Sequence, residues 1–172
     1  MDRSAGPTLL ALSALLSYPD DLLRGSARQL HADLAAANAL SAERMAALDA
    51  FAAWLGTADS PAIEAEYLAT FGSPTHLLRI FSAAREPASV REAVNSGEVI
   101  DSFSVRGLPD HLPSVLDFIS VQPVRMSALH LQGLAIPLRC AADALTLRRS
   151  RYACVIHAVM DLIEVDRVMF AH

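Results

Sequence analysis

Residues 60–72 of the chain read SPAIEAEYLATFG, and this stretch contains the signals of one complete helix. Ser60 suits an N-cap and Pro61 the first helical position, because a proline there gives up no intrahelical hydrogen bond. The apolar residues that follow recur four apart and therefore share one face: Ile63, Tyr67 and Phe71. Gly72 marks the expected end of the helix. The stretch predicts an amphipathic helix that buries an aromatic stripe.

The same spacing recurs on the N-terminal side of this stretch. Apolar residues three and four positions apart run from end to end of the chain, whereas the alternation typical of half-buried strands is nearly absent. Three earlier helices are expected to begin at caps: Thr8 for the first, which ends at Tyr18–Pro19, Asp20 or Asp21 for the second, and Ser41 for the third, which ends near residues 54–57. The apolar face of the second comprises Leu22, Leu23, Ala27, Leu30 and Leu34. This pattern predicts an all-α protein.

The C-terminal part of the chain continues the helical pattern with interruptions. Further helices are expected over the ranges 77–83, 88–103, about 124–147 and about 150–170. Pro137 is expected to kink or divide the first of the two long helices. The last helix has a plain core face: Tyr152, Val155, Ile156, Val159, Leu162 and Ile163. The length of 172 residues suits one domain, and we expect a single all-helical domain over residues 1–172.

The composition is unusually apolar, with 53% hydrophobic and 19% charged residues, so membrane insertion has to be tested first. No window approaches the roughly 18 to 20 uninterrupted apolar residues that a spanning helix needs, because charged or polar residues recur every few positions. The N-terminus lacks the small-residue cleavage site of a signal peptide. We therefore expect a cytoplasmic protein with no stable membrane insertion.

Charge and residue usage exclude several classes of function. The formal charge of −5 argues against a nucleic-acid binder, because such proteins carry a basic stripe. All 14 basic residues are arginine, so Schiff-base and phosphate-loop lysine mechanisms are excluded. The two cysteines, Cys140 and Cys154, lack the spacing of a metal site. We expect them to be buried free thiols, and we expect no metal.

A second stretch, GLPDHLPSVLDF at residues 107–118, places an Asp-His pair between two prolines. If Asp110 is an N-cap, His111, Leu112 and Pro113 form the first turn, where backbone N–H groups have no intrahelical acceptor to lose. A neutral His111 held by Asp110 suits the positive end of that helix. No nucleophile, phosphate-loop or metal motif accompanies the pair. We therefore expect that the protein is not an enzyme. The catalytic alternative is a hydrolase that uses Asp110 and His111.

Four motifs in this order resemble a known family: LLSYPDDLL at 15–23, EAEYLATF at 64–71, LPDHLPSVLDF at 108–118 and RRSRYACVI at 148–156. The chain is similar to the nitrate reductase delta-subunit assembly chaperones of the NarJ kind, within the wider TorD and DmsD group of molybdoenzyme chaperones. The resemblance extends over about residues 9–163. It implies a compact single-domain bundle of about eight to ten helices, with no catalysis and no cofactor of its own.

The resemblance also implies a partner and a site. Such chaperones bind the N-terminal peptide of a molybdenum catalytic subunit and hold the apoprotein until its pterin cofactor is inserted. By position, the family's motif falls on Pro109, Asp110, His111 and Leu112, and its aromatic pair falls on Tyr67 and Phe71. With Leu116, these are the residues expected to bind the peptide. The segment GSPTHLLRIF after Phe71 departs from the connectors of many relatives, which leaves the client open.

Physical chemistry is compatible with this role. A basic amphipathic leader could lay its apolar face into a groove between helices, and an acidic rim would attract it. The leading client is the alpha subunit of respiratory nitrate reductase. A molybdoenzyme of the DMSO reductase family with a twin-arginine leader is the second possibility, and a helical regulatory or adaptor module is the third. The resemblance allows a monomer or a domain-exchanged dimer.

Overall fold

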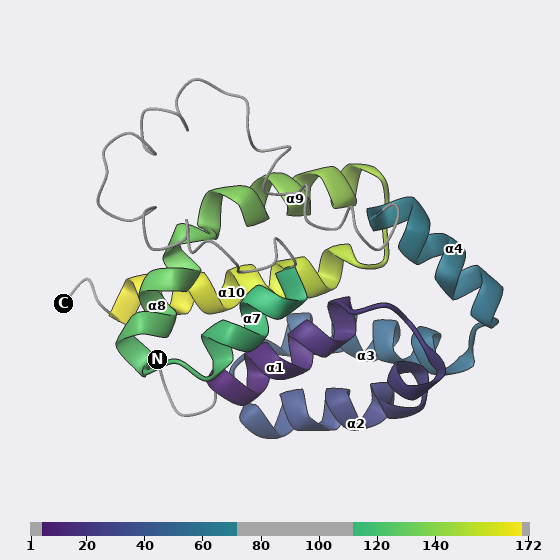
Figure 1. Ribbon diagram of the computed structural model, residues 1–172, viewed down its shortest axis with the longest axis horizontal. Coiled ribbons are helices and arrows are strands. Elements are labelled where there is room, and N and C mark those ends of the chain that lie inside the picture. The colour runs from purple at the N-terminus through teal and green to yellow at the C-terminus, as the bar shows by residue number, and fades with distance from the viewer. Residues whose placement is uncertain (1–4, 72–111, 170–172) are drawn as a thin grey trace.

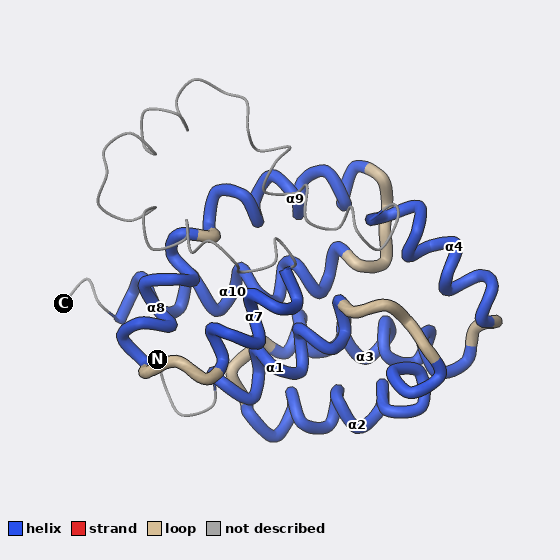
Figure 2. The backbone as a smooth tube through the Cα atoms, in the orientation of Figure 1, coloured by secondary structure: helices blue, strands red, loops and turns tan. Residues whose placement is uncertain are grey.

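The computed structural model of the chain describes residues 5–71 and 112–169, and all regular secondary structure within these two ranges is helical (Figures 1 and 2). The prediction of an all-α protein is confirmed. The described residues form eight helices: α1 (Ala5–Leu16), α2 (Asp21–Ala37), α3 (Ala42–Thr57), α4 (Ser60–Phe71), α7 (Leu112–Ser120), α8 (Val124–Gly133), α9 (Ala135–Leu147) and α10 (Ala153–Met169). The helices expected over 77–83 and 88–103, and the N-cap expected at Asp110, lie outside the described residues.

Helices α1 and α10 hold the arrangement together (Figure 1). Helix α1 packs against α2, α7 and α10, and α10 packs in addition against α3, α8 and α9. Helix α4 lies at one end of the molecule, beside the turn that joins α9 to α10. Buried residues of all these parts belong to one hydrophobic cluster. The first and last thirds of the chain therefore share a core.

One ion pair between α3 and α10 is half-buried. The Arg44 guanidinium donates from Nε to Asp161 Oδ2 at 2.8 Å and from Nη2 to Asp161 Oδ1 at 3.1 Å. This two-pronged geometry is the strong form of an Arg-carboxylate contact. The hydrogen bond to Asp161 raises the pKa of Arg44, although burial alone would lower it. The pair fixes how α3 lies against the C-terminal helix.

The caps of α2 and α3 are those that the sequence predicts. The Asp20 carboxylate accepts from the backbone N–H of Leu23 at 2.8 Å, and Ser41 Oγ accepts from the N–H of Arg44 at 3.2 Å. Each cap satisfies one of the N–H groups that a helix leaves without an internal acceptor. Asn38 caps the C-terminal end of α2, and its φ of 50° is the left-handed conformation in which asparagine often terminates a helix.

Helix α1 begins earlier than predicted, at Ala5 rather than after Thr8. The prediction that Thr8 is an N-cap is wrong, because Thr8 is fully buried inside the helix. Pro7 is the third residue of α1, where its missing N–H has no intrahelical acceptor to lose. A proline so near the start therefore does not prevent the helix from beginning before it.

The start of α4 differs from the prediction by one residue. The backbone carbonyl of Asp59 accepts from the N–H groups of Ala62 and Ile63 at 3.0 and 3.1 Å, so Asp59 takes the cap position that was expected for Ser60. Pro61 is consequently the second helical residue, which still needs no intrahelical acceptor. The buried stripe is the expected one: Ile63, Tyr67 and Phe71.

Pro137 divides the long helix expected over 124–147, but the break lies before it. Helix α8 ends at Gly133, and α9 starts at Ala135. Proline cannot donate to the carbonyl four residues earlier and its ring would collide with that carbonyl, so the break falls at residues 133–134. The last helix begins at Ala153, slightly later than expected, and the predicted core face including Tyr152 is buried.

Three burial predictions need correction. Leu22 is 81% exposed, because it lies on the flank of the α2 face that Leu23, Ala27 and Leu34 bury. Cys140 is an exposed thiol, since the buried line of α9 passes through other positions: Leu138, Ala141, Ala142 and Leu145. Cys154 is half-buried, and burial raises the pKa of its thiol to about 11. Both cysteines are free thiols, as expected.

Within the described helices, none combines the length and apolar character that crossing a membrane demands. The described residues also contain no group of three or more histidine, cysteine or acidic side chains placed to hold a metal ion.

Candidate functional site

Two of the sequence-predicted site residues, Tyr67 and Phe71, lie in a buried aromatic cluster. Their ring centroids are 5.2 Å apart, and both rings contact Tyr152, at 5.7 and 4.9 Å, edge to face. Tyr18 packs edge-on against Tyr67 at 5.4 Å. Phe51 and Trp54 of α3 extend the cluster on the other side of Tyr152. We call these six residues the aromatic cluster, and it joins α4 to α3 and to the turn before α10.

Polar contacts hold α4 against the turn between α9 and α10. Thr70 Oγ1 and Ser150 Oγ share a hydrogen bond of 2.7 Å, and the Glu66 carboxylate accepts from the backbone N–H of Arg151 at 3.0 Å. The Arg151 guanidinium in turn lies 5.1 Å from the centre of the Trp54 ring, a cation–π contact. The aromatic cluster is thus enclosed by a polar border at the end of the molecule where α4 lies.

The cluster keeps its tyrosines protonated. Burial, with the neighbouring Tyr18 as a smaller cause, raises the pKa of Tyr67 to about 12. Burial also raises the pKa of Tyr152, to which Tyr67 and Glu66 add. Tyr152 Oη is a buried hydroxyl with no hydrogen-bond partner among the described residues. Such an environment suits core packing, because the side chains of Tyr67 and Phe71 are only 1% and 6% exposed.

The other described site residues, Leu112 and Leu116, lie on α7 and are also buried. Helix α7 packs closely along α1. Ser13 Oγ of α1 donates to the carbonyl of Pro113 at 2.8 Å, and a Cβ on Gly6 would lie 2.9 Å from the carbonyl oxygen of Ser120. These two contacts fix α7 on α1 at both ends. Leu112 and Leu116 therefore support α7 from within the core.

The predicted binding set is only partly placed by the described residues. Pro109, Asp110 and His111 lie outside them. Tyr67 contacts Phe71 in the aromatic cluster, while Leu112 and Leu116 lie on α7, and all four belong to the common hydrophobic cluster. Buried side chains of this kind position the helices whose outer faces form the surface. Their part in peptide binding stays a prediction.

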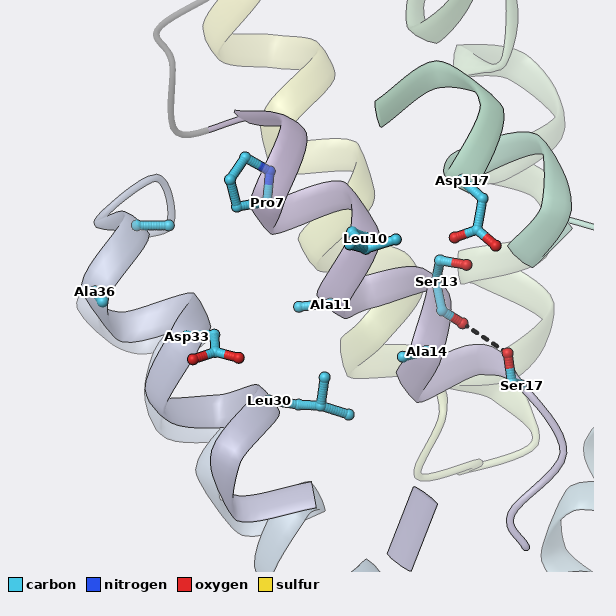
Figure 3. Close-up of a pocket in the computed structure, with 11 residues that line it drawn as sticks. Pro7, Leu10, Ala11, Ser13, Ala14, Ser17, Leu30, Asp33, Ala36 and Asp117 are labelled. Atoms are coloured by element: carbon cyan, nitrogen blue, oxygen red, sulfur yellow. Dashed lines mark hydrogen bonds between the residues drawn. The ribbon is translucent and has the colours of Figure 1, made fainter. Parts of the chain in front are cut away.

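An open groove lies elsewhere, along α1 between α2 and α7 (Figure 3). Its volume is about 830 Å³. Helix α1 contributes the floor, with Pro7, Leu10, Ala11, Ser13 and Ala14, and Ser17 adds to it just after the helix. Helix α2 contributes one wall, with Leu30, Asp33, Ala36 and Ala37, and α7 contributes Asp117 on the other side. We call this feature the α1–α2 groove.

The charges of the α1–α2 groove are all negative. Among the described residues that line it, the charged side chains are Asp33 and Asp117, and none is an arginine or a histidine. Both side chains are exposed, and neither forms an ion pair with a described residue. Gln29 donates to Asp33 Oδ1 at 2.8 Å, and this neutral amide does not cancel the negative charge. A largely apolar floor between two carboxylates that no described cation pairs with is a surface for a ligand that is both apolar and basic.

The sequence analysis did not identify this groove, although parts of its signal were present. Asp117 belongs to the same 107–118 stretch as the Asp-His pair, and Asp33 directly precedes Leu34 of the predicted apolar face. The small residues of both helices, in ALSALLS and ADLAAANA, leave room between α1 and α2. The missing information was the placement of α1 between the other two helices.

Comparison with known proteins places the chain in a family. It is 30% identical over 171 residues to the nitrate reductase molybdenum cofactor assembly chaperone NarJ of Escherichia coli strain K12, and equally to that of Escherichia coli O157:H7. Each match covers 93% of this chain and 72% of the relative. No family model matches the chain. Both relatives are chaperones, so the expectation that the chain is not an enzyme is confirmed. The chain belongs to the NarJ family of molybdoenzyme assembly chaperones.

Proposed function

We propose that this chain binds the N-terminal leader peptide of a molybdopterin-containing catalytic subunit and holds the apoenzyme until its cofactor is inserted. The client is the alpha subunit of a respiratory nitrate reductase. The observation that carries this proposal is the similarity to two nitrate reductase assembly chaperones over 93% of the chain. The chaperone acts by binding, and the cofactor chemistry belongs to the client.

The geometry supports the peptide-binding part of this function. The α1–α2 groove is open and largely apolar, and the two charged residues of its described lining are carboxylates. Peptide helices that dock in grooves bury an apolar face, and opposite charge at the rim speeds their encounter. The formal charge of −5 extends the same attraction to longer range. A basic leader therefore finds both an apolar surface and an attractive field.

Co-purification from the native host tests the proposal. The tagged chain is expected to retain the nitrate reductase catalytic subunit in its cofactor-free form, and a catalytic subunit without its leader is expected to be lost from the complex. Calorimetry with the synthetic leader then measures binding directly. The matched control is a peptide of the same composition with its apolar residues scattered around the helix, which is expected to bind weakly.

The outcome that contradicts this client is capture of a different molybdoenzyme. If the chain retains a subunit with a twin-arginine leader and ignores the nitrate reductase leader, the client is an exported enzyme of the DMSO reductase family. If it retains no molybdoenzyme subunit and binds neither leader, the proposed function is wrong. A folded protein, shown by a cooperative thermal transition, is the condition for either conclusion.

A further inference from the structure

We propose that the α1–α2 groove is the docking site of a basic amphipathic helix, with Asp33 and Asp117 contacting basic side chains on the two sides of its apolar stripe. The identity of this helix as the leader of the client rests on the proposed function. The chemistry of the site rests on the groove alone. The described residues that line the groove include none of the aromatic cluster, to which Tyr67 and Phe71 belong.

The floor of the groove is an apolar stripe on the outer face of α1. Pro7, Leu10 and Ala14 recur three and four residues apart, so they form one line along the helix, and Ser17 follows just beyond the helix end. Leu10 is 55% exposed, whereas residues on the opposite side of the same helix, such as Leu9 and Leu12, are completely buried. Helix α1 therefore has two apolar faces, and the described residues cover only one of them.

Helices α2 and α7 contribute side chains of different size to the two sides of the groove. Leu30 and Asp33 point from α2 toward α1, and Asp117 points from α7 toward the segment around Ser13 (Figure 3). Toward the C-terminal end of α2 the groove is lined by two alanines, Ala36 and Ala37, whose small side chains leave space above α1. A volume of about 830 Å³ admits several large apolar side chains. A helix lying along α1 can insert one face there.

Charge decides which helix fits. A ligand helix that lies over the α1 floor has the α2 wall on one side and α7 on the other, so each flank faces one carboxylate. Basic residues on both flanks of the apolar stripe can meet Asp33 and Asp117 together. Acidic residues at those positions would meet uncompensated like charge. The groove therefore selects helices with apolar residues at intervals of three and four and arginine or lysine on either side.

A designed probe tests the groove without reference to the client. The probe is a fluorescent peptide of about 16 residues, long enough to span the groove, with leucines on one helical face and arginines on both flanks. Its affinity for the full chain is measured by fluorescence anisotropy at low and at physiological salt. A second peptide with glutamates in place of the arginines reports the charge requirement.

Two pairs of variants separate the groove from the rest of the surface. Ala36→Trp adds bulk at a residue that lines the groove, and Ala35→Trp places the same bulk on an exposed neighbour outside the lining. Asp33→Asn with Asp117→Asn removes the groove charges, and Asp143→Asn removes an exposed carboxylate of α9. We expect Ala36→Trp to weaken probe binding about tenfold or more, and the double Asp variant to weaken it about fivefold. The two controls are expected to leave it unchanged.

The proposal is overturned if Ala36→Trp and Ala35→Trp bind the probe as tightly as the unaltered chain, or if the glutamate peptide binds as well as the arginine peptide. The native leader is measured with the same variants. If the leader binds the unaltered chain and the Ala36→Trp variant with equal affinity, the groove is not the leader site, while the chaperone function stands. If the probe binds in the groove and no molybdoenzyme leader binds the chain, the groove stands and the proposed function fails.

Discussion

The aromatic cluster and the α1–α2 groove are opposites in what they do with apolar side chains. In the cluster, Tyr67, Phe71 and Tyr152 are almost completely buried and contact one another edge to face. In the groove, Leu10 is 55% exposed, and the residues around it are small. The cluster fills space, whereas the groove leaves it open. The large aromatic residues of the cluster therefore hold this chain together, and the open apolar surface lies along α1.

The same contrast applies to charge. The cluster has its polar groups paired at its border, where Glu66 accepts from the backbone of Arg151 and Thr70 bonds with Ser150. The groove has Asp33 and Asp117, neither of which is paired with a described cation. Exposed charges without partners add little to folding stability, because water solvates them well. They are available for a partner.

The largest effect that can break this comparison is expected from Tyr67→Ala. The substitution removes a ring that contacts Tyr18, Phe71 and Tyr152 and leaves a cavity in the core. We expect a loss of about 3–5 kcal/mol in the free energy of unfolding, measured by denaturant titration. Ala36→Trp in the groove is expected to change it by less than about 0.5 kcal/mol.

The contradictory result for Tyr67→Ala would be a small loss of stability together with a large loss of leader affinity. That outcome would make the aromatic cluster a binding surface, as the family resemblance suggests for Tyr67. Tyr67→Phe is the matched control, because it keeps the ring and removes only the hydroxyl. It is expected to retain both stability and affinity.

The contrast also explains what the sequence could predict. The stripe of Ile63, Tyr67 and Phe71 follows from spacing alone, because a helix with that pattern must bury it. The caps at Asp20 and Ser41 were equally local features. These parts of the fold depend on residues a few positions apart, and all of them could be found without a structure.

The groove could not be predicted in the same way, because it depends on three helices from distant parts of the chain. Asp33 and Asp117 are 84 positions apart by residue number, and only the packing of α2 and α7 on α1 brings both to one surface. Small residues such as Ala14 and Ala36 carry no strong local signal. The predicted start of α1 was wrong for a local reason. Thr8 is a residue type that often caps helices, but Pro7 is tolerated inside the first turn, so the helix begins before both.

A smaller effect is expected at alkaline pH, where Tyr67 of the cluster titrates. Burial raises the pKa of Tyr67 from 10.0 to about 12 in the folded state. In the unfolded chain the phenol loses its proton near the ordinary value, so the folded state holds more protons above it. Stability is therefore unaffected by Tyr67 below pH 10 and falls as the pH rises toward 12. We expect a loss of about 2 kcal/mol from this residue.

The measurement is a series of denaturant titrations over that pH range. Cys154→Ala serves as the background, because burial also raises the pKa of Cys154, to about 11, and its thiol would titrate in the same direction. Adding Tyr67→Phe is expected to remove the share that belongs to Tyr67. An unchanged slope in the doubly substituted chain would mean that Tyr67 ionises freely and is not enclosed by the cluster.

Two glycine substitutions test how the packing of α1 and α2 beside the groove affects stability. A Cβ at Gly6 would lie 2.9 Å from the backbone oxygen of Ser120, so Gly6→Ala has to push α7 away from α1. We expect a loss of about 1–2 kcal/mol despite the better helix propensity of alanine. Gly25→Ala in α2 meets nothing within 4 Å and is expected to gain about 0.5–1 kcal/mol.

The two glycine variants also differ in binding. Asp117 is carried by α7, so Gly6→Ala is expected to shift this carboxylate and weaken binding of the arginine probe, while Gly25→Ala leaves the affinity unchanged. Thermal denaturation and fluorescence anisotropy on the same samples give both quantities. Equal affinities for the two variants would show that the position of α7 does not matter to the ligand.

The smallest effect is expected from Tyr152→Phe. Tyr152 is fully buried at the centre of the aromatic cluster, and its hydroxyl has no hydrogen-bond partner among the described residues. A buried polar group without a partner lowers stability, because folding removes it from water without replacing its hydrogen bond. We therefore expect Tyr152→Phe to raise the free energy of unfolding by up to about 1 kcal/mol. Tyr18→Phe is the contrasting variant, since Tyr18 is 40% exposed and its hydroxyl interacts with the Glu64 carboxylate, so its removal is expected to bring no gain. A loss of stability on Tyr152→Phe would show that the hydroxyl has a partner in the folded protein, and the cluster would then be a polar site as well as an apolar one.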